Sequence, residues 1–476
     1  MDVTSVVKLI ASSAADASVA LAGAEALCAL TGGRGAMRER EQVLRKAGAK
    51  LGARCAEAAA VGAEPALVSV LEAHAGDARV CGAACFALRN IWGISGEGGE
   101  AADAARAAPA LVAALAAHAG DESVCAGACS ALANIADFEC ATAIIAAGAV
   151  PAAVAALLAH AGDPGVCVGA CRLLGITALF AAERGGPNAE AHAAVMSAMP
   201  ALVAALSVHA GDARVCSVVC RALVSIAVSD EGEAAIVGAG ALPAIVNVLA
   251  THGGKEDVSI AACQLLGSLV SSDEHRATVV AAGAVPAIVA ALVARAGETD
   301  MRGAAARAMG SIAEGAEGGA AVAPALLAAL GAHAGQADVC QAACSVLNEV
   351  TCSDEGEAAV VAAGGVPLVV AALITHASEA GVCSAACRVL GNVAVRPRGR
   401  RGRVRGGVRS ACDSPRLLRE RLGSRRSPQG CAGHPRGPGG RVPGSVLRAA
   451  PHGRGRRGRC RHRRVRRRGG AARPLR

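Results

Sequence analysis

The amino-acid sequence predicts an all-α fold: a right-handed superhelical solenoid of about eight to nine three-helix repeats, followed by a disordered basic tail. Two observations predict this class. First, 53% of the 476 residues are hydrophobic, yet there are only one Trp, three Phe and no Tyr. The apolar content is therefore mostly Ala, Val, Leu and Ile, and small side chains allow helices to approach closely. Second, the sequence repeats with a period of about 43 residues, within the range of helical solenoids.

A histidine marks the repeat. The stretch HAGDARVC occurs at 74–81 and again at 209–216. A proline lies nine residues before the marked position in every unit, and the spacings between units are 44, 42, 49, 43, 43, 38 and 43 residues. Positions in a unit are counted from this residue, so that +7 lies seven residues after it. The marked residues are His74, His118, His160, His209, His252, Arg295, His333 and His376.

The sequence of one unit, residues 230–270, shows how the three helices are predicted. Asp230, followed three residues later by Glu233, has the spacing of a capping box and opens a short first helix. Gly240 ends that helix with a left-handed cap. Pro243 then starts a second helix, where its missing N–H costs nothing.

The third helix follows the marked histidine. The second helix ends near His252, and Asp257 is expected to cap the third, as Asp77 and Asp212 do in other units. Its apolar residues recur at the spacing of one buried helix face. Because one unit cannot cover that face, neighbouring units must stack. The stripe comprises Val258, Ala262, Leu265, Leu266 and Leu269.

The stretch AGAVPAIVAALVARAGETDMRGAAARAMGSIA, at 282–313, resembles the armadillo repeat. It shares the Gly-x-x-Pro turn, the apolar second helix and the ending that ALRNI (87–91), ALANI (131–135) and VLGNV (389–393) also keep. It is most similar to the armadillo units of leucine-rich-repeat kinases and related scaffolds. The resemblance covers residues 61–394 and implies an armadillo-type array that binds protein. No kinase, GTPase or leucine-rich motif accompanies it.

Three regions follow from the repeat. Residues 1–60 are expected to form a degenerate N-terminal capping repeat with a charged insertion, and Ser13 takes the histidine position there. Residues 61–394 form the repeat array. Residues 395–476 form an Arg-, Gly- and Pro-rich tail with no fixed fold. Acids at Asp2, Asp16 and Glu25 argue against a secretory signal, which predicts a reducing compartment and free thiols.

Cysteines recur with the histidines, and two interpretations stay open. Six units carry Cys at both +7 and +11, a spacing that puts both thiols on one helix face. A histidine and two thiolates could gather zinc. The favoured interpretation is packing, in which Cys acts as a small buried hydrophobe and His bonds carbonyls at a helix C-terminus. The sixth unit supports packing, because it keeps the repeat with Arg295, Arg302 and Ala306 at these positions. We therefore predict no metal and no cofactor.

The sequence contains no Gly-x-Ser-x-Gly, His-Glu-x-x-His or P-loop motif, so we predict a protein that is not an enzyme and has no catalytic residues. The uncharged stretch 141–160 is long enough to suggest a membrane span. The break at Gly148 and Pro151 leaves two limbs that are too short to cross about 30 Å of hydrocarbon. We therefore expect no membrane span.

Positions +5, +9, +12 and +16 lie opposite the predicted buried stripe and are expected to face a groove lined by the third helices. An arginine fork can grip carboxylate or phosphate, and Asn can clamp an extended backbone. We therefore hypothesise that an extended acidic or phosphorylated protein segment binds across Arg172, Arg221 and Arg307. The only Trp is Trp92, so the tryptophan ladder of nuclear-cargo carriers is missing. The candidate groove residues are Asn90, Asn134, Arg172, Arg221, Gln264, Arg307, Arg388 and Asn392.

The tail reverses the charge of the chain. From 395 to 476 there are 27 Arg and no Lys against Asp413 and Glu420, a charge of +25, and the other 21 basic and 37 acidic residues give −16. A basic arm could bind nucleic acid through phosphate charge. The favoured alternative is a reading-frame slip, because SDEGEAA-like codons read out of phase yield mostly Arg and Gly. We expect a cytoplasmic monomer, with the nucleus as the alternative location.

Overall fold

The computed structural model describes residues 2–32, 50–95, 101–136, 140–183 and 189–395. Within these ranges every regular element is an α-helix, and no strand occurs. The chain divides into two units, Met1–Ser414 and Pro415–Arg476, and the helices belong to the first. Most of the charged insertion at 34–55 lies outside the described residues, and its last six residues, 50–55, are helical. The tail from 396 onwards also lies outside the described residues. The all-α prediction is confirmed.

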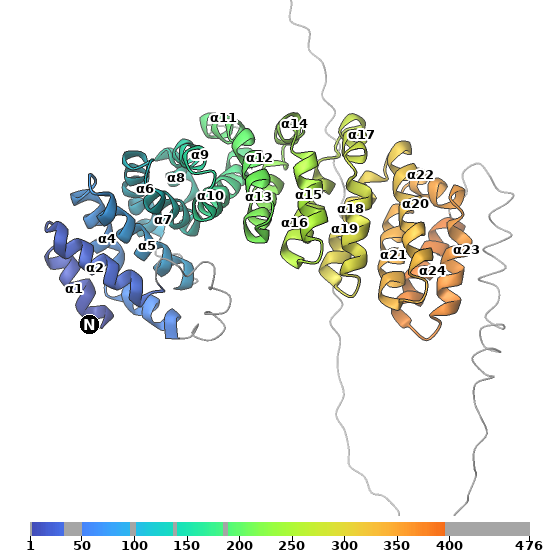
Figure 1. The fold of residues 1–476 in the computed structure, drawn as a ribbon, viewed down its shortest axis with the longest axis horizontal. Helices are drawn as coiled ribbons and strands as arrows, with labels where there is room; N and C mark the ends of the chain where they lie inside the picture. Colours follow the sequence, from blue (N-terminus) through green and yellow to red (C-terminus); the bar gives the residue numbers. More distant parts are fainter. Residues whose placement is uncertain (1, 33–49, 96–100, 137–139, 184–188, 396–476) are drawn as a thin grey trace, which may run out of the picture. The chain divides into compact units, whose positions relative to one another are not determined.

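Third helices recur side by side along the described part of the chain (Figure 1). Each packs against the third helix of the next unit, and the main contacts are between units adjacent in the sequence. This dependence on neighbours defines a solenoid. The third helices are α2 (Ala17–Leu30), α5 (Ala78–Ser95), α7 (Glu122–Ile135), α10 (Pro164–Glu183), α13 (Ala213–Ile226), α16 (Glu256–Ser268), α19 (Thr299–Ile312), α21 (Ala337–Val350) and α24 (Ala380–Val395).

First and second helices precede the third helices. The second helices are α1 (Val3–Ser12), α4 (Ala63–Ala73), α9 (Ala149–Ala159), α12 (Met199–Val208), α15 (Leu242–His252), α18 (Ala284–Ala294) and α23 (Gly365–Thr375). The first helices are α8 (Ala141–Ala146), α11 (Ala189–Ser197), α14 (Asp230–Gly238), α17 (Asp273–Ala281) and α22 (Asp354–Ala362), and residues 50–60 are also helical. In two units they merge into α6 (Ala101–Ala117) and α20 (Ala316–Ala332).

In five units a glycine three residues before the proline separates the first two helices, whereas in the fourth unit α11 and α12 separate at Ala198 with Ser197 at the glycine position. Gly148 and Gly283 each have φ of 83°, a left-handed conformation that other residues avoid. Gly62, Gly240 and Gly364 do the same in their units. Arg106 and Ala321 stand at this position in the merged helices α6 and α20, which continue through their prolines. The predicted turn at Gly240 is confirmed.

The predicted caps are correct in part. Asp77 and Asp212 accept backbone N–H groups at the starts of α5 and α13. The cap predicted at Asp257 is wrong, because α16 starts after Lys255 and Asp257 already lies in its first turn. The capping box predicted from Asp230 is also wrong. Ser229 is the N-cap of α14 and accepts the Gly232 N–H at 3.1 Å.

Glu233 therefore does not cap α14, and its side chain is buried between two units. Its Oε1 accepts from the Ser271 N–H at 2.9 Å and contacts His275 Nδ1 at 2.7 Å. Burial by itself would raise the pKa of Glu233, but the hydrogen bonds from Ser271 and His275 outweigh it and lower the pKa. This carboxylate joins α14 to the start of α17.

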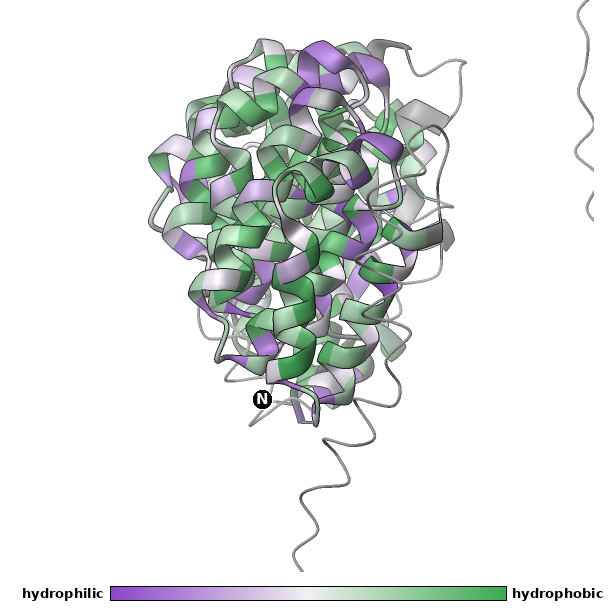
Figure 2. Ribbon diagram, turned by 90° about the vertical axis from the view of Figure 1, so that its right-hand side faces the viewer, coloured by the Kyte–Doolittle hydropathy of each residue, from purple (hydrophilic) through white to green (hydrophobic). Residues whose placement is uncertain are grey.

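The core is a continuous apolar layer between the helices. The stripe predicted on α16 is confirmed: Val258 is 2% exposed, and Ala262, Leu265, Leu266 and Leu269 are fully buried. Leucines at +14, such as Leu88 and Leu223, are also fully buried. Hydrophobic residues run through the stacked helices (Figure 2). Stacking thus covers the face that one unit cannot.

Length and composition would allow one stretch, Ala191–Val208, to cross a membrane, and up to four if each bent helix pair counts as one span. The pairs bend by 82°, 64° and 78° at their breaks, which coincide with the first-to-second helix turns of the repeat. The stretch 141–160 is divided into α8 and α9 at Gly148, as expected from the sequence.

Candidate functional site

The recurrent histidines join consecutive units. All stand at or beside the end of a second helix, and in all but His333 the Nε2 lies 2.7–2.8 Å from a carbonyl oxygen of the preceding unit. Because a carbonyl can only accept, Nε2 carries the proton and donates. The predicted carbonyl-bonding role is confirmed, and the acceptor belongs to the neighbouring unit. The pairs are His74–Ala14, His118–Ala75, His160–Ala119, His209–Ala161, His252–Ala210 and His376–Ala334.

The +7 side chain adds a second hydrogen bond to the carbonyl of the marked residue, which already accepts a backbone N–H, as the His74 carbonyl does from Asp77 at 2.9 Å. Cys81 Sγ donates to the His74 carbonyl at 3.3 Å, and Cys216 Sγ donates to the His209 carbonyl at 3.2 Å. Ser259 makes the same kind of bond to His252, at 3.1 Å. A serine can replace the cysteine because either side chain supplies one donor. The +7 cysteine therefore acts as a loop cap.

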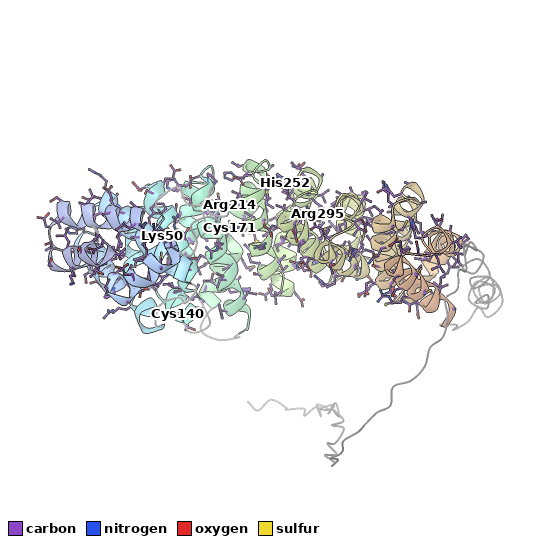
Figure 3. The ribbon with its side chains drawn as sticks, turned by 90° about the horizontal axis from the view of Figure 1, so that it is seen from below. Lys50, Cys140, Cys171, Arg214, His252 and Arg295 are labelled. Atoms are coloured by element: carbon purple, nitrogen blue, oxygen red, sulfur yellow. The ribbon has the colours of Figure 1, made fainter. Side chains whose placement is uncertain are left out.

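The sixth unit makes the connection with arginine. Arg295 Nη1 donates to the Gly254 carbonyl at 2.6 Å, and its Nη2 pairs with Glu256 at 3.4 Å and also with Glu298. The neighbouring histidine and this arginine are labelled in Figure 3. The longer side chain of Arg295 thus takes the place of a histidine at the contact with the preceding unit, and it also forms ion pairs with two glutamates.

The +7 arginine of the same unit complements this change. Arg302 Nη1 donates to the Ala296 carbonyl at 3.0 Å. In the other units that carbonyl would accept from the next histidine, here His333. Within the described residues, the Ala296 carbonyl therefore accepts a hydrogen bond from Arg302 of its own unit instead of from the next unit. Arg295 changes the contact with the fifth unit, and Arg302 changes the contact with the seventh.

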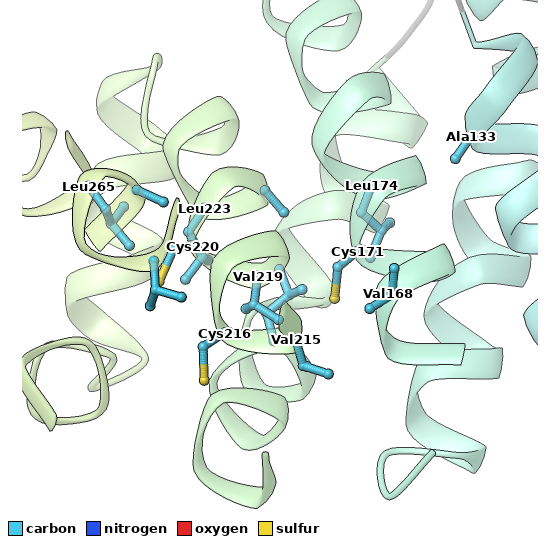
Figure 4. Packing of buried hydrophobic residues seen from close by; sticks show 14 of the residues in the cluster. Ala133, Val168, Cys171, Leu174, Val215, Cys216, Val219, Cys220, Leu223 and Leu265 are labelled. Carbon is cyan, nitrogen blue, oxygen red and sulfur yellow. The ribbon is translucent and has the colours of Figure 1, made fainter. Parts of the chain in front are cut away.

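The +11 cysteines, except Cys387 in the last unit, are buried between third helices. Cys171 and Val168 on α10 lie against Val215 and Val219 on α13 (Figure 4), and all are 3% exposed or less. Burial raises the pKa of Cys263 and of Cys344 to about 12. These thiols stay protonated at neutral pH and pack as small hydrophobes.

Burial also raises the pKa of four +7 thiols, Cys81, Cys125, Cys167 and Cys216, to about 11. Burial, with a smaller contribution from Asp163, raises the pKa of Cys167 to about 11, although its Sγ lies 3.5 Å from His209 Nε2. A neutral thiol is a poor nucleophile and a poor metal ligand. Among the described residues, no three His, Cys, Asp or Glu side chains come together to hold a metal ion.

Two of the four positions expected to face the groove are instead inter-unit contacts. At +9 the residues are small because the preceding third helix lies against them: a Cβ on Gly127 would come within 2.9 Å of the Cys85 Cβ. Ala261 and Ala304 at +9 are 1% and 0% exposed. The expectation that +9 faces the groove is wrong.

The +16 asparagines turn their amides towards the preceding unit. Asn90 is 3% exposed and lies 3.4 Å from the Cys28 carbonyl, so its expected exposure in the groove is wrong. Asn134 Nδ2 donates to the Arg89 carbonyl at 2.9 Å. Asn392 Nδ2 donates to the Asn348 carbonyl at 3.2 Å. These side-chain amides were expected to bond to the backbone of a partner, and they bond instead to backbone carbonyls of the preceding unit.

The +12 position changes character along the chain. Phe86 is 7% exposed and Ser130 is fully buried. From the third unit onwards +12 is accessible: Arg172 is half-buried, and Arg221, Gln264, Arg307 and Arg388 are exposed. The candidate groove arginines therefore lie on α10, α13, α19 and α24, with Gln264 on α16. We call this line of side chains the +12 row.

A residue at +5 of each following unit accompanies the +12 row. Arg221 Nη2 lies 3.2 Å from Asp257 Oδ1, with side-chain exposures of 60% and 79%. The same register pairs Arg214, the +5 residue of α13, with Arg172, and we infer from it that these two half-buried arginines lie near each other. We call Arg172, Arg214 and Arg221, on α10 and α13, the cationic cluster. Sequence reasoning missed Arg214, although it occupies a position that had been assigned to the groove.

The N-terminal part of this face is acidic. A cavity of about 630 Å³ lies between α5, the start of α7 and the start of α10. Hydrogen bonding to Asp163, reinforced by its charge, raises the pKa of Glu122. Arg89 lies over the Phe86 ring, 4.5 Å from its centre. The face therefore carries acids at one end and arginines from α10 onwards.

Comparison with known proteins supports the helical repeat fold. No protein-family model and no curated protein matches the chain. A crystal structure of an engineered protein is similar, with 26% sequence identity and a TM-score of 0.61, and the match covers 89% of this chain and 94% of that one. A second engineered protein matches with 23% identity and a TM-score of 0.37, covering 66% of this chain and all of its own.

Proposed function

We propose that this protein is a non-catalytic, armadillo-type scaffold that binds an extended acidic or phosphorylated protein segment on the third-helix face. The three-helix units with a Gly-x-x-Pro break support the armadillo assignment. The observation that carries the binding proposal is the cationic cluster Arg172, Arg214 and Arg221 on two adjacent helices.

Physical chemistry favours an anionic ligand at this cluster. Helices packed side by side are about 8–10 Å apart, which an extended peptide spans with two to three residues at about 3.3 Å each. Arginine forks bind carboxylate and phosphate through paired hydrogen bonds. The Arg221–Asp257 pair is exposed, and such pairs are worth about 0–1 kcal/mol, so a phosphate can displace Asp257 at little cost.

The experiment compares two triple variants of the full chain. R172E/R214E/R221E removes the cluster, whereas K8E/K50E/R79E makes the same charge change at exposed residues of the N-terminal units, away from it. Each is tested on an array of extended acidic, phosphoserine and phosphothreonine peptides. We expect the cluster variant to bind at least roughly a hundredfold more weakly, since several charge-assisted bonds are lost, and the control variant to bind normally.

Equal losses in both variants would indicate an effect of net charge alone and would remove the cluster as a site. Binding of neutral peptides as strongly as phosphorylated ones would exclude the anionic ligand.

The charge of residues 395–476 favours a second candidate, binding of nucleic acid through the tail. Neutralising several phosphates makes affinity fall steeply with salt. The test measures binding of double-stranded DNA by the full chain and by residues 1–394 over a series of salt concentrations. Salt-sensitive binding that vanishes on truncation supports this candidate, and binding that survives truncation excludes the tail.

A further inference from the structure

Among the described residues, the last unit has no successor against which to bury the face that every earlier unit buries. Cys387 at +11 is exposed, whereas Cys344 in the preceding unit is fully buried. Leu373, three residues before His376, is half-buried, whereas its counterpart Leu330 is 2% exposed. We call this surface of α23 and α24 the end face.

The end face contains a glycine whose neighbour is missing. A Cβ on Gly175 or Gly267, both at +15, would lie 2.9 or 2.8 Å from the Cα of Ala222 or Ala308, at +13 of the next unit. Glycine is needed there because another backbone approaches closely. Gly391 occupies the same position, and nothing lies within 4 Å of its Cβ site.

Helix α2 presents the complementary surface. In the internal interfaces a small +9 residue lies over the +11 cysteine, as Gly127 does over Cys85. In the first unit the +9 and +13 residues are Ala22, which is exposed, and Ala26, which is half-buried. The described residues thus carry both halves of one internal interface, uncovered at opposite ends of the repeat.

We propose that a second copy of this chain docks head to tail on the end face, with its α2 stacked on α24. By the register of the internal interfaces, Ala22 of the second copy lies over Cys387, and Ala26 fills the space above Gly391. The interaction is heterologous, so it links chains into open or ring-closed oligomers. A concentration-dependent oligomer thus replaces the monomer expected from the sequence.

The proposed interface between two copies is expected to be weaker than the interfaces between units of one chain, because it lacks two side-chain hydrogen bonds. The histidine that donates to the preceding unit is Ser13 in the first unit, and the +16 position is Ala29. The carbonyls of Ala377 and Gly391, which would accept from these two positions, therefore gain no side-chain donor from the second copy. Packing alone holds the chains together.

Sedimentation velocity of the full chain over a concentration series tests the proposal. We expect reversible association that Gly391→Leu weakens at least roughly tenfold, with the monomer fold intact because the Cβ site is empty. Ala22→Glu, at the opposite end, should weaken association similarly. Ser13→His restores one hydrogen bond and should strengthen it by roughly fivefold.

Alkylation of Cys387, followed by mass spectrometry, locates the contact. Head-to-tail docking predicts that Cys387 reacts in dilute solution and becomes protected as concentration rises, while Cys352, exposed elsewhere, reacts throughout. Protection that does not depend on concentration would mean that the chain covers its own end face, which overturns the proposal. A monomer at every concentration overturns it too. Loss of association with Gly391→Leu but not with Ala22→Glu would contradict head-to-tail stacking.

Discussion

The fifth and eighth units have similar sequences but different surroundings. Leu249 and Cys263 in the fifth unit are buried by the sixth, whereas Leu373 is half-buried and Cys387 is exposed at the end of the array. The comparison shows that the repeat pattern specifies a surface, and that only the neighbouring unit turns this surface into core. In a solenoid, burial is a property of the interface between units.

The largest effect should come from filling a glycine. Gly267→Leu forces a side chain into the Ala308 backbone and should destabilise the protein by about 3 kcal/mol. The matched change Gly391→Leu, at an open site, should change stability by less than about 0.5 kcal/mol. Urea unfolding followed by circular dichroism measures both. Equal losses of stability in the two variants would show that Gly391 is packed as closely as Gly267, which contradicts the difference described between the two units.

The loss of stability at alkaline pH should depend on a buried cysteine of the fifth unit and not on its counterpart in the eighth. Burial raises the pKa of Cys263 from its ordinary value of 9.0 to about 12. Folding therefore favours the protonated thiol, so its contribution is complete below pH 9 and is lost as pH rises from 9 towards 12. Between these values it costs about 1.4 kcal/mol per pH unit.

Urea midpoints measured from pH 7 to pH 10.5 check this expectation. Cys263→Ala should make the alkaline decline shallower, whereas Cys387→Ala, at an exposed position, should leave it unchanged. A decline of the same steepness in wild type and in Cys263→Ala would contradict the assignment.

Removing a histidine should have a smaller effect. His252→Ala leaves the Ala210 carbonyl without its donor, and we expect a loss of about 1 kcal/mol. His252→Gln serves as the control, because its amide can donate to the same carbonyl. If zinc mattered at these positions, adding a chelator would lower the thermal midpoint of the wild type, and we expect no change.

The smallest effect should come from exchanging the +7 donors. Cys340→Ser should change stability by less than about 0.5 kcal/mol, because Ser259 performs the same capping in the fifth unit. Cys340→Val removes the donor and should cost about 1 kcal/mol. The two variants, compared by thermal unfolding, separate capping from simple packing. A larger loss in Cys340→Ser than in Cys340→Val would contradict the capping role.

Much of the fold could be predicted from the sequence because its signals are local. The proline and glycine positions predicted the helix breaks, and the spacing of Val258, Leu265 and Leu269 predicted the buried stripe. The errors arose where a residue had two available partners. Glu233 has capping-box spacing, yet it bonds to Ser271 and His275 in the next unit. Asp257 was assigned to a cap and instead pairs with Arg221.

The sequence by itself determined the repeat and its helices, because each depends on residues within one unit. Only the tertiary structure decided which cysteines are buried between units, which carbonyl each histidine reaches and why Asn90 is buried. These are contacts between residues about one repeat apart, and their geometry depends on how two units stack. A helical period fixes which residues share a face, whereas the stacking register fixes what that face meets.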